Sequence, residues 1–239
     1  MKNLIVITGA SSGIGRATAK KFSTEGHPLL LIARRLEPML ELGLPDTLCR
    51  SVDVSDIPNF KSAVEEAEAE YGPVDLLVNN AGYMNLESSG IQSPVEWQKQ
   101  FDVNCVGLLN MTSIIFPKMM TRKGGTIINI GSTAGKNISD FHTAYNGTKF
   151  AVHAMTEALR REGHSHKVRV SLVAPGLTET ELSNGTSNPN ILKAREEYKA
   201  NIGGALNAET IAEAVLFIYQ QPQSVCIRDV TVAPTGQIG

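Results

Sequence analysis

The chain has 239 residues, of which 42% are hydrophobic and 19% are charged, and its formal net charge is −2 at pH 7. This length and apolar content allow a large buried core, and we expect residues 1–239 to form a single domain. Because the charge is nearly balanced and Lys and Arg are scattered along the chain, we expect no nucleic-acid partner.

The beginning of the chain and its cysteines bear on where the protein works. The apolar run at residues 4–7 is too short for a signal sequence, and no apolar run has the length of a membrane span, so we expect no membrane partner. Three widely spaced cysteines without a CxxC pair fit a reducing cytoplasm. Apart from His164 and His166 in a polar turn, the histidines lack paired ligand spacing, and we expect no metal site.

Short β-branched runs alternate with longer amphipathic stretches along most of the chain, a pattern typical of repeated βαβ units. We therefore predict an α/β fold of the Rossmann type, with a doubly wound parallel sheet of about seven strands and helices on both faces. The strands are expected at residues 4–7, 29–33, 48–52, 76–79, 126–130, 168–173 and 225–232. The helices are expected at residues 15–25, 60–71, 96–120, 144–161 and 208–220.

Residues 182–206 depart from this alternation. They begin with a segment rich in Ser, Asn, Gly and Pro, continue with a short helical pattern and end near the pair Gly203 and Gly204. Such a composition permits hinge motion without building a core, and we expect a lid over the substrate.

The sequence TGASSGIG lies between the first strand and the first helix, with Gly9, Gly13 and Gly15 at the turn. Glycine lets the backbone approach a pyrophosphate, and the helix that follows offers free N–H groups and the positive end of its dipole. Taken alone, the motif is also typical of a plain glycine-rich turn, whereas a P-loop is excluded because no Gly-Lys-Ser/Thr follows. The cofactor contacts expected in this segment are Gly9, Ser11, Ser12, Gly13, Ile14, Gly15 and Arg16.

Tyr145 and Lys149 are four residues apart in YNGTK at the start of a helical pattern, so both side chains lie on one helix face. A free phenol titrates near pH 10, and a nearby ammonium favours its ionised form. Ser132 follows the strand at residues 126–130, where its hydroxyl can stabilise a developing oxyanion. Taken singly, the YxxxK pair is typical of a solvated helix face and the serine of a helix cap.

The TGxxxGxG spacing, followed in order by Ser132, Tyr145 and Lys149, resembles the short-chain dehydrogenase/reductase family over nearly the whole chain. The resemblance implies an oxidoreductase that moves hydride between NADP(H) and a carbonyl or secondary alcohol. By the same resemblance, Tyr145 is the acid/base, Ser132 polarises the carbonyl and Lys149 also holds the nicotinamide ribose. Asn104 matches the family's asparagine that positions a water chain for proton relay, although a buried polar residue is the alternative. The resemblance also implies cofactor contacts at Asp53, Val54, Asn80, Ala81, Gly82, Tyr145, Lys149, Pro175, Gly176, Thr178 and Thr180.

The end of the second strand reads Ile32-Ala33-Arg34-Arg35 and lacks the acidic residue that binds a ribose 2′-hydroxyl in NAD enzymes. Arg34 offers a planar fork to a 2′-phosphate, Arg16 is a second candidate, and Arg35 is expected in solvent. The sequence therefore predicts NADP(H), and the alternative is that all three arginines are solvated surface charges.

Within the family, the start of the chain, GHPLLLIARR and VCIRDVTVAPT are similar to NADPH-binding blue-fluorescent proteins and 3-hydroxy-acid dehydrogenases. The alternative function is accordingly an NADPH-binding sensor or fluorescent protein with incidental turnover. An epimerase or dehydratase is disfavoured, because that branch uses TGxxGxxG and a larger carboxyl-terminal domain. The substrate is expected to be a small molecule bound near Gly82 and residues 132–145 and 177–206. The resemblance and the apolar helices at residues 96–120 and 144–161 predict a homotetramer.

Overall fold

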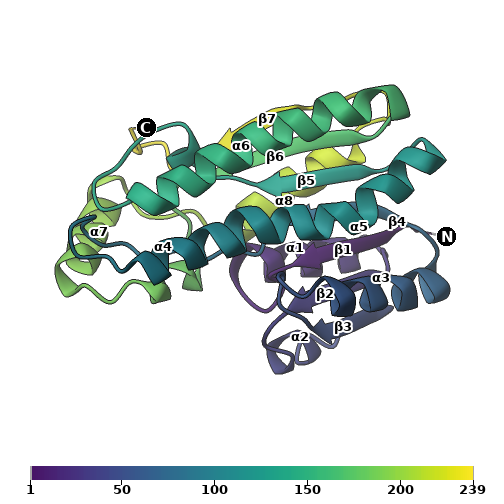
Figure 1. Ribbon diagram of the computed structural model, residues 1–239, viewed down its shortest axis with the longest axis horizontal. Helices are drawn as coiled ribbons and strands as arrows, with labels where there is room; N and C mark the ends of the chain where they lie inside the picture. Colours follow the sequence, from purple (N-terminus) through teal and green to yellow (C-terminus); the bar gives the residue numbers. More distant parts are fainter. Residues whose placement is uncertain (1, 239) are drawn as a thin grey trace.

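Within residues 2–238, which the computed structural model describes, seven strands form one parallel sheet (Figure 1). They span Leu4–Thr8 (β1), Leu29–Ala33 (β2), Thr47–Ser51 (β3), Val74–Asn79 (β4), Thr126–Ile130 (β5), Arg169–Pro175 (β6) and Asp229–Val232 (β7). Their order across the sheet is β3-β2-β1-β4-β5-β6-β7, and each neighbouring pair is parallel. The predicted Rossmann-type α/β fold is confirmed.

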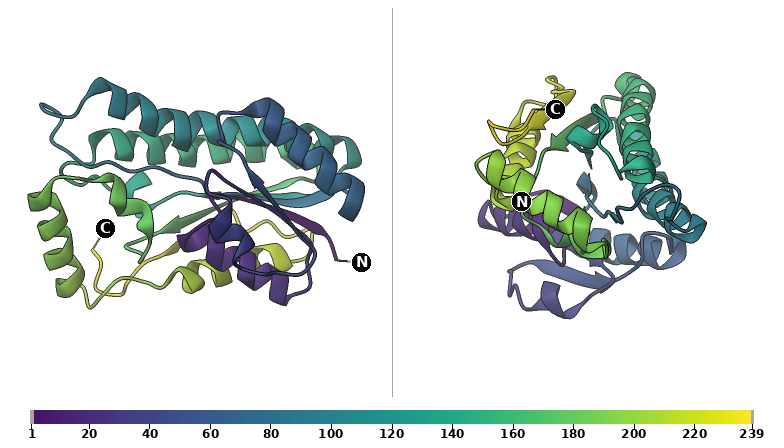
Figure 2. Two further views of the ribbon diagram at one scale, coloured as in Figure 1. Left: turned by 90° about the horizontal axis from the view of Figure 1, so that it is seen from below. Right: turned by 90° about the vertical axis from the view of Figure 1, so that its left-hand side faces the viewer.

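Helices cover both faces of this sheet, as the two views of Figure 2 show. They span Gly13–Thr24 (α1), Glu37–Leu40 (α2), Ile57–Tyr71 (α3), Pro94–Phe101 (α4), Gly107–Arg122 (α5), Thr143–Gly163 (α6), Pro189–Asn201 (α7) and Ala208–Gln220 (α8). Leu4 and Val6 of β1 belong to the apolar core shared with α3, α5 and α6, whereas Ile5 and Ile7 belong to the core shared with α1 and α8. Side chains alternate between the faces of a strand, so wholly apolar strands bury both faces.

Some element boundaries differ from the sequence prediction. The last strand, expected over residues 225–232, is restricted to Asp229–Val232. The guanidinium of Arg169 donates hydrogen bonds to the carbonyls of Gln221 (2.8 Å) and Val225 (3.4 Å), so a side chain rather than a strand ladder holds the backbone before β7. Helix α2 was not predicted, because four residues are too few to show a helical period.

Helices α4 and α5 form one continuous helix, Pro94–Arg122, joined by a π-helical turn at Asp102–Val106 (η1). By length and composition this helix is apolar enough to cross a membrane, which differs from the sequence-based expectation that no segment is. Half of its most apolar stretch is buried inside the protein, where Met111 and Ile115 belong to the core between α5 and the sheet. Packing on the sheet therefore accounts for the apolar residues on its inner side.

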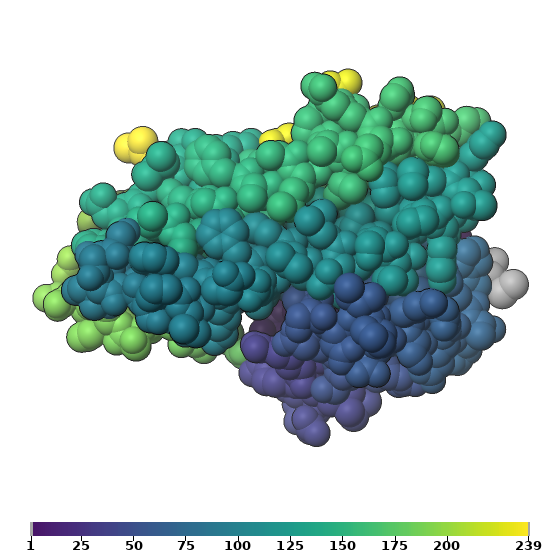
Figure 3. Space-filling view, in the orientation of Figure 1, coloured from purple at the N-terminus to yellow at the C-terminus, as the bar shows by residue number. Residues whose placement is uncertain are grey.

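The outer side of the same helix also carries apolar residues. Phe101, Val106 and Leu109, together with Phe150 of α6, are each between 40% and 47% exposed. Helix α4 contacts α6, and in Figure 3 the teal and green segments of these helices form one continuous face. Single exposed apolar residues are ordinary on protein surfaces, whereas a group of them on neighbouring helices favours contact with another protein chain.

The carboxyl ends of the strands point to the end of the sheet at which α7 lies (Figure 1). Strands β1 and β4 are neighbours at the centre, and the chain leaves them towards opposite edges of the sheet. In open α/β sheets, the crevice at such a switch point is where ligands bind.

Candidate active site

A cavity of about 1260 Å³ opens at the carboxyl ends of the strands. Residues after β1 to β6 line it, together with residues of the segment predicted to be a lid. The predicted site residues in its wall are Gly9, Ser11, Ser12, Gly13, Ile14, Arg34, Asp53, Val54, Asn80, Ala81, Gly82, Ser132, Tyr145, Lys149, Pro175, Gly176, Thr178 and Thr180. The remaining predicted residues, Gly15, Arg16 and Asn104, lie outside that wall.

The turn between β1 and α1 leaves little room for side chains. Gly9 has a φ of +67°, which favours glycine, and a Cβ at Gly15 would lie 2.4 Å from the Gly9 carbonyl oxygen. Asn80, which follows β4, donates a hydrogen bond from Nδ2 to the Thr8 carbonyl (2.9 Å). The backbone N–H groups of Asn80 and Ala81 each donate to the Thr8 hydroxyl (3.0 Å). These contacts lock the glycine turn to the loop after β4.

The amino-terminal end of α1 reaches the cavity wall through Ser12 and Gly13. Ser12 is the N-cap residue, and within the described chain its side chain caps no N–H of the helix. The first turn of α1 contains no acidic residue. The N–H groups of this turn and the positive end of the helix dipole therefore suit an anion, which fits the pyrophosphate of a dinucleotide.

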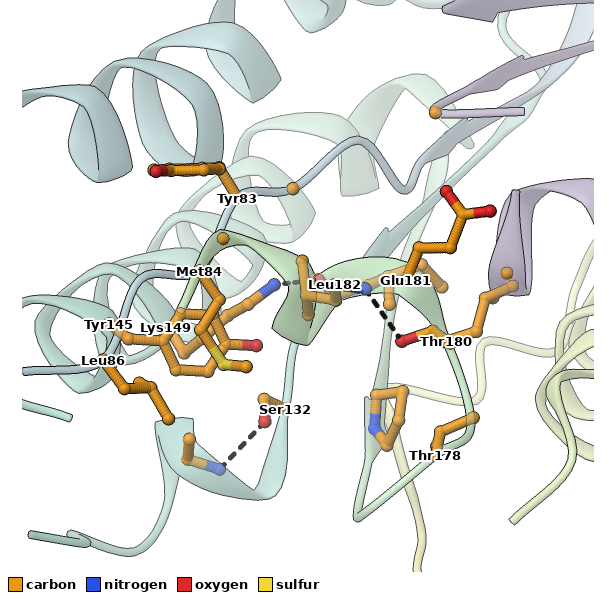
Figure 4. A pocket seen from close by; sticks show the side chains of 18 of the residues that line it. Tyr83, Met84, Leu86, Ser132, Tyr145, Lys149, Thr178, Thr180, Glu181 and Leu182 are labelled. Atoms are coloured by element: carbon orange, nitrogen blue, oxygen red, sulfur yellow. Dashed lines mark hydrogen bonds between the residues drawn. The ribbon is translucent and has the colours of Figure 1, made fainter. Parts of the chain in front are cut away.

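Tyr145, Lys149 and Ser132 lie together in the wall of the cavity (Figure 4). Tyr145 and Lys149 come from consecutive turns of α6, and each is 6% exposed. Lys149 Nζ is 5.7 Å from the centre of the Tyr145 ring and donates a hydrogen bond to the carbonyl of Ile130 (3.0 Å). In Figure 4 the Tyr145 and Ser132 hydroxyls face the same space. A reacting oxygen placed there would meet both hydroxyls.

Burial controls the ionisation of this pair. Loss of solvent raises the pKa of Tyr145 to about 12, although the Ser132 hydroxyl and the charge of Arg195 act in the opposite direction. Loss of solvent also lowers the pKa of Lys149 to about 8, against the attraction of the nearby Cys105. In the protein alone, Tyr145 is therefore a neutral phenol at physiological pH, and added positive charge nearby would favour its ionised form.

Ser132 is held in place by its neighbours. Its hydroxyl accepts a hydrogen bond from the Ala134 N–H (3.1 Å), and its own N–H donates to Nε2 of His153 (3.4 Å). Burial lowers the pKa of His153, which favours the neutral ring that can accept this bond. A Cβ at Gly131 or Gly135 would lie 2.6 or 2.5 Å from His153 Nε2, so both glycines make room for the imidazole. This role of His153 beside Ser132 was not predicted from the sequence.

Asn104 lies in the π-helical turn η1 and is 3% exposed. Its Oδ1 accepts a hydrogen bond from the Tyr83 N–H (2.7 Å), and its Nδ2 donates to the Tyr83 carbonyl (2.9 Å) and the Thr148 hydroxyl (3.0 Å). Asn104 thus ties the loop after β4 to α6, next to Lys149. These contacts are those of a buried polar residue, and its role in proton relay stays a prediction.

Arg34 and Arg35 both line the cavity after β2. Arg35 is exposed, as expected, and its guanidinium also forms an ion pair with Glu181 (2.7 Å) and donates to the Ser11 hydroxyl (3.4 Å). Arg35 faces the glycine turn because its main chain follows the end of β2 next to β1. Arg16 instead lines a second cavity, of about 270 Å³, outside the main one.

Asp53 lies in the cavity wall, close to the charge of Arg34. Burial acts to raise the pKa of Asp53, but hydrogen bonds from the N–H and hydroxyl of Ser55 and the charge of Arg34 outweigh it and leave this pKa lowered. The carboxylate is therefore ionised and fixed by its own turn, beside the predicted phosphate-binding arginine.

The substrate end of the cavity was predicted only as segments of the chain, near Gly82 and at residues 132–145 and 177–206. There the wall is formed by the loop after β4, the turn before α6 and helix α7. His142 lies in this wall with its ring 6.3 Å from that of Tyr145. The short helical pattern expected within residues 182–206 is α7, whose residues between Ile191 and Tyr198 reach this wall. The additional wall residues include Tyr83, Met84, Leu86, His142, Ile191, Ala194, Arg195, Tyr198 and Gln237.

Comparisons with known proteins agree with this geometry. A model of the short chain dehydrogenase family matches residues 3–190. An uncharacterized oxidoreductase of Staphylococcus saprophyticus is 32% identical over 240 residues, covering 98% of this chain and 96% of its own. The NADP-dependent 3-hydroxy acid dehydrogenase YdfG of Escherichia coli is 34% identical over 239 residues, covering 98% and 96%. The closed form of a serine dehydrogenase complexed with NADP⁺ has a TM-score of 0.92 and 32% identity, covering 99% of this chain and 96% of its own.

Proposed function

This chain belongs to the short-chain dehydrogenase family of oxidoreductases, and we propose that it transfers hydride between NADP(H) and a carbonyl or secondary alcohol. The observation that carries the proposal is the placement of Tyr145, Ser132 and Lys149 in one cavity with the glycine turn. The NADP dependence of the YdfG relative and the NADP⁺ in the serine dehydrogenase complex support the choice of cofactor.

In the reductive direction, Tyr145 gives its phenolic proton to the carbonyl oxygen, and Ser132 donates a hydrogen bond to that oxygen as negative charge develops. NADPH supplies the hydride that the carbonyl carbon receives. In the oxidative direction, Tyr145 takes the proton of the alcohol. Lys149 contributes positive charge beside the phenol, and its remaining protons are suited to ribose hydroxyls.

The residues after β2 support NADP(H) rather than NAD(H). Ala33 is 7% exposed and carries no carboxylate that would repel a 2′-phosphate. Arg34 and Arg35 line the cavity beside it, and a guanidinium binds phosphate through paired N–H groups. Because Arg35 is paired with Glu181, a phosphate would compete with that carboxylate for it.

Residues 182–206 form the proposed lid. They include α7 and most of the short helical turn Glu181–Gly185, and they supply cavity residues such as Leu182 and Ile191. We further propose that residues 1–239 act as one catalytic domain in the cytoplasm, on a small-molecule substrate.

Replacing Tyr145 with Phe removes the acid/base while keeping the ring. We expect turnover to fall by about 10²–10⁴-fold, because proton transfer by a positioned side chain contributes about that much, with little change in NADPH affinity. The measurement is NADPH consumption on a panel of aldehydes, ketones and keto acids, with Tyr71→Phe as the control. Near-native turnover by Tyr145→Phe would exclude the role, and a native protein that binds NADPH without turning over any compound would favour the sensor alternative.

Cofactor preference tests the arginines after β2. A charge-assisted hydrogen bond contributes about 1.5–3 kcal/mol, so one good contact to the 2′-phosphate gives about 10–100-fold preference for NADPH over NADH. We expect the native protein to show such a preference in kcat/KM, and Ala33→Asp combined with Arg34→Ala to lose it. Arg161→Ala is the matched control, since Arg161 is exposed and lines neither cavity. A native preference for NADH contradicts the proposal.

The exposed apolar face on α4, α5 and α6 supports the proposal of a homotetramer. Replacing Phe101 and Phe150 with Ser should shift the assembly towards smaller species, because burial of these rings favours association. Light scattering at micromolar concentration measures the mass of each species. A monomeric native protein would refute the assembly.

A further inference from the structure

One face of helix α7 forms a wall of the main cavity. Ile191, Ala194, Arg195 and Tyr198 all line it, and their spacing of three, four and seven residues places them on one side of a helix. Ile191 is 7% exposed and packs in an apolar cluster with Met84, Leu86 and Tyr145. This face of α7 therefore packs next to Tyr145. Figure 4 shows the Met84, Leu86 and Tyr145 side chains of this wall.

The charged residues of α7 differ in how they are paired. Lys193 pairs with Glu197 (3.8 Å), and Lys199 pairs with Glu179 (2.5 Å) and Glu196 (4.0 Å). Within residues 2–238, Arg195 makes no ion pair or hydrogen bond, although its side chain is partly buried. Its guanidinium lines the cavity, and the carboxylates of Glu179 and Glu196, whose charges act on it without an ion pair, are paired with Lys199.

We infer that Arg195 binds the carboxylate of an acidic substrate whose carbonyl or alcohol group lies at Ser132 and Tyr145. The inference rests on the proposed function and names the substrate class: a hydroxy acid and the corresponding keto acid. A guanidinium presents paired N–H groups that match a carboxylate, and partial burial strengthens the attraction.

The surroundings of Arg195 fit this assignment. The acidic residues of the cavity wall are Asp53, Asp140 and Glu181. Glu181 is paired with Arg35, Asp53 accepts hydrogen bonds from Ser55, and the charge of Asp140 acts on His142. Met84, Leu86 and Ile191 pack with Tyr145 and give this part of the cavity an apolar lining that suits a short carbon chain. The glycine turn and α1 supply separate sites for the cofactor phosphates, so Arg195 is available to the substrate.

The charge of Arg195 also reaches the catalytic tyrosine. It acts to lower the pKa of Tyr145, against the larger effect of burial. A carboxylate bound to Arg195 would offset part of this positive charge. Substrate binding at Arg195 would therefore weaken its effect on the pKa of Tyr145. Its main effect is accordingly expected in KM rather than in kcat.

The kinetic test uses acids and their neutral esters. In Arg195→Gln, kcat/KM for 2-, 3- or 4-hydroxybutyrate, whichever the native enzyme prefers, should fall by about 10–100-fold through a higher KM. For the methyl ester of the same acid it should change less than threefold. Lys193→Gln, which removes an equal charge from the same helix, should leave both unchanged, and Arg195→Lys should restore part of the loss. Equal losses for acid and ester in Arg195→Gln would overturn the inference.

A binding measurement separates this inference from the proposed function. Acetoacetate and NADP⁺ cannot react with each other, so calorimetry can measure acetoacetate binding to the NADP⁺-loaded protein without turnover. We expect Arg195→Gln to weaken it at least tenfold, Lys193→Gln to leave it unchanged, and methyl acetoacetate to bind equally to all three proteins. Acetoacetate binding that is absent or insensitive to Arg195 overturns the inference. Arg195-dependent binding without turnover of any hydroxy acid supports it and counts against the proposed oxidoreductase activity instead.

Discussion

The burial of Tyr145 and Lys149 beside one cavity is the constraint on which the site depends. Removing a phenol and an ammonium from water disfavours the charged form of each, which is why the pKa of Tyr145 rises and that of Lys149 falls. In the described chain, the Ile130 carbonyl is the hydrogen-bond acceptor of Lys149 Nζ. Because an ammonium has three protons, the protein leaves part of its hydrogen-bonding capacity for a ligand. The pair is thus poised to act only when the cavity is filled.

The rest of the fold keeps this pair in register with the glycine turn. The Thr8 contacts of Asn80 and Ala81 join β1 to the loop after β4, and Asn104 joins that loop to α6. Each such bond is worth only about 0.5–1.5 kcal/mol to stability, so their value lies in fixing positions at the carboxyl ends of the strands. The parallel sheet, buried on both faces, supplies the rigid frame for these loops.

Much of the fold and the site was predictable, because the signals were local. Buried strands and the turn between β1 and α1 are each recognised from a run of contiguous residues. The spacing of Tyr145 and Lys149 likewise places them on one helix face. The partners of Arg35 and the pocket position of Arg195 were not predictable, since Glu181 and Tyr145 reach them only through tertiary packing. His153 was missed for the same reason: its contact with Ser132 joins residues 21 positions apart. The late start of β7, at Asp229, likewise involves the distant Arg169, whose guanidinium holds the preceding backbone.

The central claim is that the positive charge of the oxidised cofactor makes Tyr145 an effective base towards an alcohol. Ultraviolet difference titration of the native protein against Tyr145→Phe measures ionisation of this one phenol. Without cofactor, the account predicts a pKa close to the value of about 12 that burial imposes. With saturating NADP⁺, it predicts a pKa lower by about two or more pH units, because the positive nicotinamide ring adds to the charges that favour the phenolate. A Tyr145 pKa that is the same with and without NADP⁺ would contradict the account.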